Sequence, residues 1–223
     1  MNKAKSRAAG LIIVTVACCV ISAVAETLIE PPYIVKSAMK IAVFLGIPLI
    51  YARIAGIRLF ENFRSVDKKD IAKLLALGAA VYAVIFGTYL LTQNVFDYAA
   101  LVRSQAEDQR VGGGNFIPVA LYISFGNSFL EEFLFRLVAF LKLSEHLNRK
   151  AAYVFSSVMF AAYHVAIIGA TFPPALLAAA LAALAVGGFI FDLVDAKRGN
   201  IYNSWIVHMF ADFAIMTVWY INM

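Results

Sequence analysis

The chain has 223 residues, of which 62% are hydrophobic and only 15% are charged, and its mean hydropathy is +0.80. This composition excludes an ordinary water-soluble domain. The net charge of +5 does not indicate nucleic-acid binding, because the sequence has no basic stripe interleaved with aromatic residues. We therefore expect a single all-α integral membrane domain over residues 1–223, surrounded by the lipid bilayer.

Seven apolar segments have the character of membrane-spanning helices. In chain order they cover residues 11–28, 36–51, 71–92, 117–141, 151–168, 174–194 and 203–221. Gly46 and Pro48 interrupt the second and shortest segment, so we expect a kink there or a helix that continues past Arg53. The polar stretch from Asp97 to Asn115 ends in glycines and predicts a flexible outer loop.

Basic residues gather in alternate connections of this predicted bundle. They precede the first segment and follow the second, fourth and sixth, which places the N-terminus in the cytoplasm and the C-terminus outside. The first segment has a second interpretation, because its basic start and the run Ala23-Val24-Ala25 also fit a cleaved signal peptide over residues 1–25. Cys18 and Cys19 are adjacent, which excludes a disulfide framework.

The fourth segment carries a narrow polar stripe. Its members recur at helical spacing and are Ser124, Asn127, Ser128 and Glu131. Ionisable groups at membrane depth are costly unless they face the bundle interior, so each one suggests a functional site. Glu132 lies about 100° around the helix from Glu131 and has Arg136 four residues later, which predicts an ion pair. Glu131 then lacks an obvious local partner, an environment that suits a general base.

Two later segments add imidazole groups. The fifth segment carries His164, with Phe160 one turn before it, and the seventh carries Ser204, His208 and Asp212 at intervals of four residues. One carboxylate and two imidazoles on three helices suffice to position and deprotonate a water molecule and to stabilise an oxyanion. Peptide hydrolysis is one reaction that these groups can catalyse.

Other designs of intramembrane protease leave recognisable motifs. The sequence contains no GxSxG, HExxH or GxGD, which disfavours the serine, zinc and aspartyl types. We expect no cofactor. Zinc stays an alternative, because two histidines and a glutamate can complete a catalytic zinc site with water, although their spacing here is not compact.

Three short motifs carry a resemblance to a known family. They are Glu131-Glu132-Phe-Leu-Phe-Arg136, Phe160-Ala-Ala-Tyr-His164 and His208-Met-Phe-Ala-Asp212. In this order they resemble the series EExxxR, FxxxH and HxxxN/D of the CAAX protease and bacteriocin-processing family, the glutamate-type intramembrane endopeptidases. The resemblance covers residues 117–221, which would form the catalytic core, with residues 1–92 as accessory spans.

The resemblance implies a role for each motif residue. Glu131 would activate the attacking water with help from His164, while His208 and Asp212 would stabilise the oxyanion. Four further residues would support the site: Glu132, Arg136, Asn127 and Phe160. The commoner family pattern has Asn at the last motif position, and an ionised Asp cannot donate a hydrogen bond to an oxyanion. Asp212 is therefore either protonated or orients His208.

The function expected from this resemblance is that of an intramembrane endopeptidase in a prokaryotic plasma membrane. Its substrate would be a membrane-anchored protein or peptide cleaved near its C-terminal tail: a prenylated protein, a peptide precursor or a protein with a sorting tail. Two alternatives stay open. One is a non-catalytic scaffold or immunity protein of the same fold, and the other is a small proton-coupled transporter, which the absence of an internal repeat disfavours.

Overall fold

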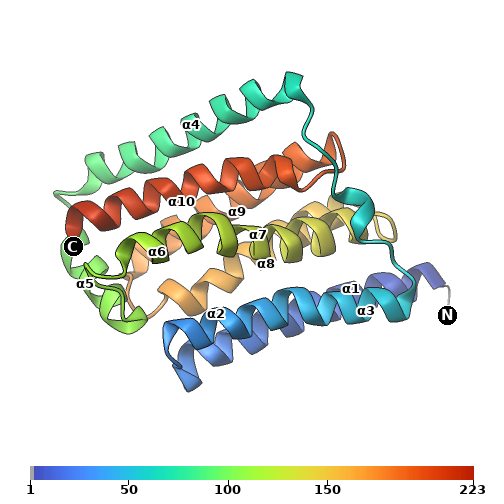
Figure 1. The fold of residues 1–223 in the computed structure, drawn as a ribbon, viewed down its shortest axis with the longest axis horizontal. Coiled ribbons are helices and arrows are strands. Elements are labelled where there is room, and N and C mark those ends of the chain that lie inside the picture. The colour runs from blue at the N-terminus through green and yellow to red at the C-terminus, as the bar shows by residue number, and fades with distance from the viewer. Residues whose placement is uncertain (1–2) are drawn as a thin grey trace. The chain divides into compact units, whose positions relative to one another are not determined.

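The computed structural model describes residues 3–223 and shows an all-α protein with eight helices in that range (Figure 1). The α labels run to α10 because π-helical segments divide two of the helices: α2 and α3 belong to one helix, and α6 and α7 belong to another. The label η marks the π-helical segments and one 3-10 segment. The elements are α1 (Lys3–Val24) with η1 (Ala25–Ile29), α2 (Tyr33–Ile41) with η2 (Ala42–Gly46) and α3 (Ile47–Ala55), the short 3-10 segment η3 (Phe60–Asn62), α4 (Lys68–Thr92), α5 (Tyr98–Gln109), α6 (Phe116–Leu121) with η4 (Tyr122–Asn127), α7 (Ser128–Glu131) and η5 (Glu132–Lys142), α8 (Arg149–Ile168), α9 (Pro174–Ala196) and α10 (Tyr202–Asn222).

Six of the helices are long and apolar enough to cross a membrane by length and composition. They are Lys3–Ile29, Tyr33–Ala55, Lys68–Thr92, Arg149–Ile168, Pro174–Ala196 and Tyr202–Asn222, and they indicate a multi-pass membrane protein. The helix from Phe116 to Lys142 is not among them, because its polar and charged side chains lower its hydropathy. A seventh crossing by this helix and a cytoplasmic N-terminus stay predictions.

The helix ends follow local capping rules. Asp67 precedes α4 and accepts a hydrogen bond from the Lys69 amide at 3.0 Å, and Asn148 does the same for the Lys150 amide before α8. The second helix continues past Arg53, one of the two outcomes predicted for it, and ends at Gly56, whose φ of 65° suits glycine.

The prediction of a flexible loop between Asp97 and Asn115 is wrong. Residues Tyr98–Gln109 form helix α5, which begins where Asp97 accepts a hydrogen bond from the Ala100 amide at 2.9 Å. Its polar composition hid it from a search for apolar segments. After α5, the chain turns at Gly112, whose amide donates to the side chain of Asn115 at 2.7 Å.

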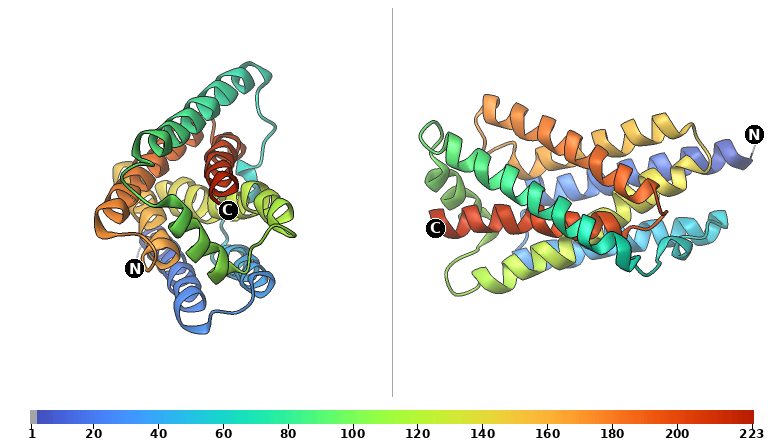
Figure 2. Two further views of the ribbon diagram at one scale, coloured as in Figure 1. Left: turned by 90° about the vertical axis from the view of Figure 1, so that its left-hand side faces the viewer. Right: turned by 90° about the horizontal axis from the view of Figure 1, so that it is seen from above.

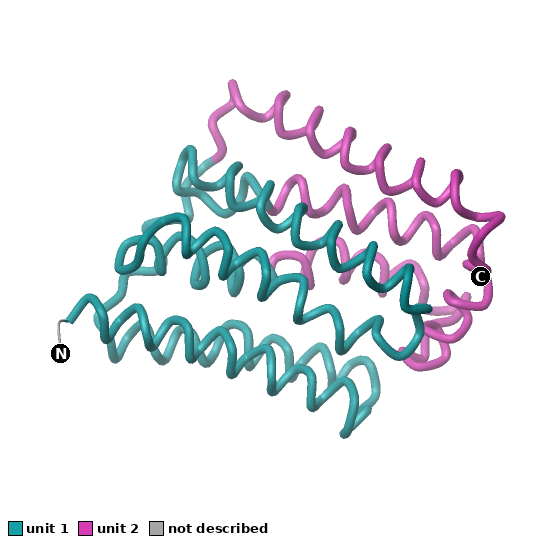
Figure 3. The backbone as a smooth tube through the Cα atoms, turned by 180° about the vertical axis from the view of Figure 1, so that it is seen from behind, with its two compact units in different colours: residues 1–65, 130–204 teal, residues 66–129, 205–223 magenta. Residues whose placement is uncertain are grey.

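The chain divides into two compact units, each described here by itself (Figure 3). The first unit comprises residues 1–65 and 130–204 and the second comprises residues 66–129 and 205–223. In the first unit every residue of η5 is buried, and this segment contacts α1, α8 and α9. A single domain with a core at 117–221 stays a prediction.

Helices α8 and α9 run side by side in the first unit (Figure 2). Gly188 on α9 makes this close approach possible, since a Cβ there would lie 3.2 Å from the Ser157 backbone and 3.3 Å from the Phe160 ring. Small residues at helix contacts are typical of membrane proteins. Phe44 completes the core beside these helices, with its ring 6.0 Å from Phe135 and 5.4 Å from Tyr163.

The second unit brings α4 and the start of the fourth predicted segment against α10. The hydroxyl of Tyr82 donates to Thr217 at 3.0 Å, and the amide of Asn222 donates to the Tyr89 hydroxyl at 3.1 Å. The rings of Phe125 on η4 and Phe213 on α10 meet edge to face at 5.6 Å. Polar pairs and aromatic contacts thus hold this unit together.

Candidate active site

Glu131 stands at the end of α7, and its carboxylate is almost fully buried. Its Oε1 atom lies 2.7 Å from the ammonium of Lys40 on α2, and the two side chains are 3% and 14% exposed. No partner for Glu131 was obvious on its own helix from the sequence, and the structure gives it one on another helix. The partner comes from a segment 91 residues earlier in the chain, which spacing along one helix does not reveal.

His164 on α8 faces the other oxygen of the same carboxylate. Its Nε2 atom lies 3.9 Å from Glu131 Oε2. Its Nδ1 atom lies 2.7 Å from the carbonyl oxygen of Phe160, and because a carbonyl only accepts, Nδ1 carries the hydrogen. A neutral imidazole in this tautomer turns the lone pair of Nε2 toward Glu131. The structure thus brings together two of the predicted catalytic residues.

Glu132 and Arg136 form the predicted ion pair. The Nε atom of Arg136 lies 3.3 Å from the carboxylate of Glu132, and both side chains are fully buried. The guanidinium also lies 3.8 Å from Asp192 on α9 and over the rings of Phe160 and Phe191, at 4.2 and 5.0 Å. Phe160 therefore covers the arginine, and its role in supporting an active site stays a prediction.

Two buried aspartates of α9 were not identified from the sequence. Asp192 accepts hydrogen bonds from Ser156 at 3.0 Å and from Ser157 at 3.4 Å. Asp195 accepts from both the amide and the hydroxyl of Ser204, at 2.9 and 2.7 Å, and so joins the end of α9 to the start of α10. Each was a possible signal in the sequence, since acidic residues in an apolar helix are rare.

His208 and Asp212 lie on α10 within the second unit. His208 Nε2 lies 3.7 Å from Asp212 Oδ1, and both residues are buried. Asn127, the other predicted supporting residue, is half-buried in the same unit. A role for these three residues beside Glu131 stays a prediction. The stripe residue Ser128 accepts a hydrogen bond from the Trp205 indole at 3.1 Å, which gives it a structural partner.

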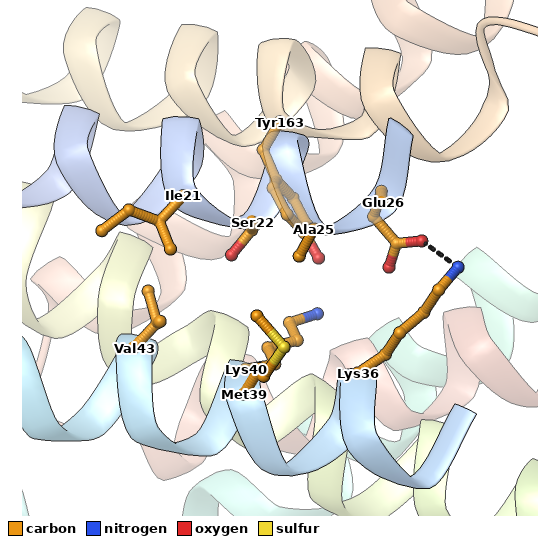
Figure 4. A pocket seen from close by; sticks show the side chains of 9 residues that line it. All are labelled: Ile21, Ser22, Ala25, Glu26, Lys36, Met39, Lys40, Val43 and Tyr163. Carbon is orange, nitrogen blue, oxygen red and sulfur yellow. Dashed lines mark hydrogen bonds and ion pairs between the residues drawn. The ribbon is translucent and has the colours of Figure 1, made fainter. Parts of the chain in front are cut away.

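A small pocket opens between the first two helices of the first unit, next to Lys40 (Figure 4). It is lined by Ile21, Ser22, Ala25, Glu26, Lys36, Met39, Lys40, Val43 and Tyr163. Lys36 and Glu26 form an ion pair of 2.7 Å along its edge. Lys40 is thus shared between this pocket and the Glu131 carboxylate.

Sequence reasoning missed Lys40 and Tyr163. Lys40 could have been found, because it is an ionisable residue inside the second apolar segment. Tyr163 left no such signal, since tyrosine is common in membrane helices. Within residues 3–223 no three His, Cys, Asp or Glu side chains gather in a group that could hold a metal ion.

Comparison with known proteins places the EExxxR, FxxxH and HxxxD motifs inside one family match. Residues 113–214 match the family model described as Type II CAAX prenyl endopeptidase Rce1-like. Searches of curated proteins and of solved structures gave no match. The matched segment includes Glu131, His164 and His208 in the order that the family resemblance predicts. The chain therefore carries a domain of the Rce1-like type II CAAX prenyl endopeptidase family over residues 113–214.

Proposed function

We propose that the protein is an intramembrane endopeptidase that hydrolyses a peptide bond near the C-terminal tail of a membrane-anchored protein or peptide. The observation that carries the proposal is the pairing of a buried carboxylate and an imidazole, Glu131 Oε2 and His164 Nε2, at 3.9 Å. The family match over residues 113–214 supports a hydrolase. A scaffold of the same fold would not need this pair.

The two groups can hold one water molecule between them. A hydrogen bond from water to either acceptor is about 2.8 Å long, so a separation of 3.9 Å lets a single water donate one hydrogen to each. Its lone pair is then free to attack. Lys40 contacts Oε1, the other oxygen of the Glu131 carboxylate, and so lies on the side away from the proposed water.

Hydrolysis follows from this arrangement. Glu131 takes a proton from the water as the water oxygen bonds to the scissile carbonyl carbon, and the electrons of the C=O bond move onto the carbonyl oxygen. Collapse of the tetrahedral intermediate breaks the C–N bond, and the proton held by Glu131 passes to the leaving amine. From the family match, which includes the HxxxD motif, we propose that His208 stabilises the oxyanion and that Asp212, 3.7 Å from His208, orients its imidazole.

The test is cleavage of defined peptides by the purified protein in lipid vesicles. Two probes are used, a prenylated peptide ending in a CAAX sequence and an unprenylated peptide with a hydrophobic C-terminal tail, and the products are identified by mass spectrometry. Glu131→Gln and His164→Ala should each lower the rate by at least about 10²-fold in a protein that stays folded. Equal rates for the wild type and Glu131→Gln, or no cleavage of either probe, would count against the proposal.

A further inference from the structure

The ammonium of Lys40 is held in a fixed place beside the carboxylate of Glu131. The ion pair is 2.7 Å long, and the Lys40 side chain is only 14% exposed. The ammonium also lies 5.1 Å from the ring centre of Phe44 and 4.9 Å from that of Tyr163, distances typical of cation–π contacts. Few alternative positions are open to a side chain held on these three sides.

The two oxygens of Glu131 face two different nitrogens. Oε1 lies against Lys40, whereas Oε2 lies 3.9 Å from His164 Nε2. Tyr163, which contacts Lys40, directly precedes His164 on α8. Lys40 therefore fixes the rotation of the carboxylate and leaves one particular oxygen toward the imidazole.

We infer that Lys40 is a positioning residue of the active site, supplied by α2 from outside the segment that matches the family. The inference rests on the proposed peptidase function. Its positive charge balances Glu131 at membrane depth, and its fixed ammonium aims Oε2 at the attacking water. The second helix is then part of the catalytic apparatus and not only an accessory to it.

Helix α2 offers a matched control. Lys36 lies one turn before Lys40 and also forms a 2.7 Å ion pair, but with Glu26 of the first helix. Its side chain is 10% exposed, close to the value for Lys40. Loss of either lysine removes a similar ion pair from the same helix, and of the two it is Lys40 that pairs with Glu131.

The experiment compares the wild type with Lys40→Met, Lys40→Arg, Lys36→Met and Glu131→Gln in the vesicle assay with the two peptide probes. We expect Lys40→Met to lower kcat by about 10²-fold, because a base displaced by about 1 Å loses a factor of that size, while KM changes by less than about twofold. Lys40→Arg restores the charge and should recover most of the lost kcat. Lys36→Met should keep the kcat and KM of the wild type.

Each result supports or overturns the inference. Wild-type kcat in Lys40→Met overturns it, as does an equal loss in Lys36→Met or a folded Lys40→Arg with no recovery. If Lys40→Met does not fold, Lys40→Gln replaces it, because glutamine can still donate a hydrogen bond to Glu131 but carries no charge. A full rate in Glu131→Gln sinks the peptidase proposal itself, whereas Glu131 dependence without Lys40 dependence sinks only this inference.

Discussion

At the scale of single residues, the two neighbouring glutamates have different partners. Glu132 neutralises Arg136, and both are fully buried. We expect Glu132→Gln to lower the free energy of unfolding by about 3 kcal/mol, the low end of the range for breaking a buried pair, because Asp192 stays 3.8 Å from the guanidinium. Thermal unfolding in detergent measures this loss.

The control is Glu145→Gln, which removes an exposed partner of Lys142 and should change the free energy of unfolding by less than about 1 kcal/mol. Unaltered stability in Glu132→Gln would contradict a structural role.

Residue spacing predicted only those contacts that one helix makes with itself. Glu132 and Arg136 are four residues apart, so their pairing follows from helical geometry. The pairing of Glu131 with Lys40 depends on how the second helix lies against the helix of the EExxxR motif, which no local rule fixes. The same is true of Asp192, whose serine partners are on another helix. The sequence thus indicated which polar residues lie inside the apolar segments, whereas the packing of the helices determines which residues each of them contacts.

At the scale of helices, Gly188 sets the distance between α8 and α9. Gly188→Leu would force side-chain atoms against Ser157 and the Phe160 ring that covers Arg136. We expect a loss of about 1–3 kcal/mol in the free energy of unfolding, the usual effect of overpacking. The adjacent Gly187→Leu is the control, since a Cβ there meets nothing within 4 Å. Thermal unfolding of both variants tests this prediction. An equal loss at both positions would show that the contact between α8 and α9 does not depend on the small size of Gly188.

The apolar periodicity located the long helices, although the first one begins at Lys3, well before its predicted start at Leu11, and it missed α5. The seven predicted segments all fall within helices, because burial in lipid requires a continuous apolar run. Helix α5 follows a different rule: it begins at the capping side chain of Asp97 and is built from good helix formers that stay polar. A capping residue followed by such a run would have identified it.

At the scale of the whole molecule, the number of crossings decides on which side each terminus lies. Six helices have the length and composition of membrane spans. If the Phe116–Lys142 helix also crosses, the count is odd and the termini lie on opposite sides; if it does not, they lie on the same side. We expect it to cross, because Glu131, Glu132 and Arg136 are all buried inside the protein, where they do not meet lipid.

Whether the number of crossings is odd or even can be tested with single cysteines, which are labelled in sealed cells by a maleimide that does not cross the membrane. Ser6 lies at the start of the first span and Ser65 follows the second, so Ser6→Cys and Ser65→Cys should both report the cytoplasmic side whatever the Phe116–Lys142 helix does. Met223→Cys should be labelled from outside. The native Cys18 and Cys19 are buried, so they give little background. If Met223→Cys is labelled only after the cells are opened, both termini lie on the same side of the membrane. The helix that carries Glu131 then does not cross the membrane. The contacts of Glu131 with Lys40 and His164 would be unaffected by this result.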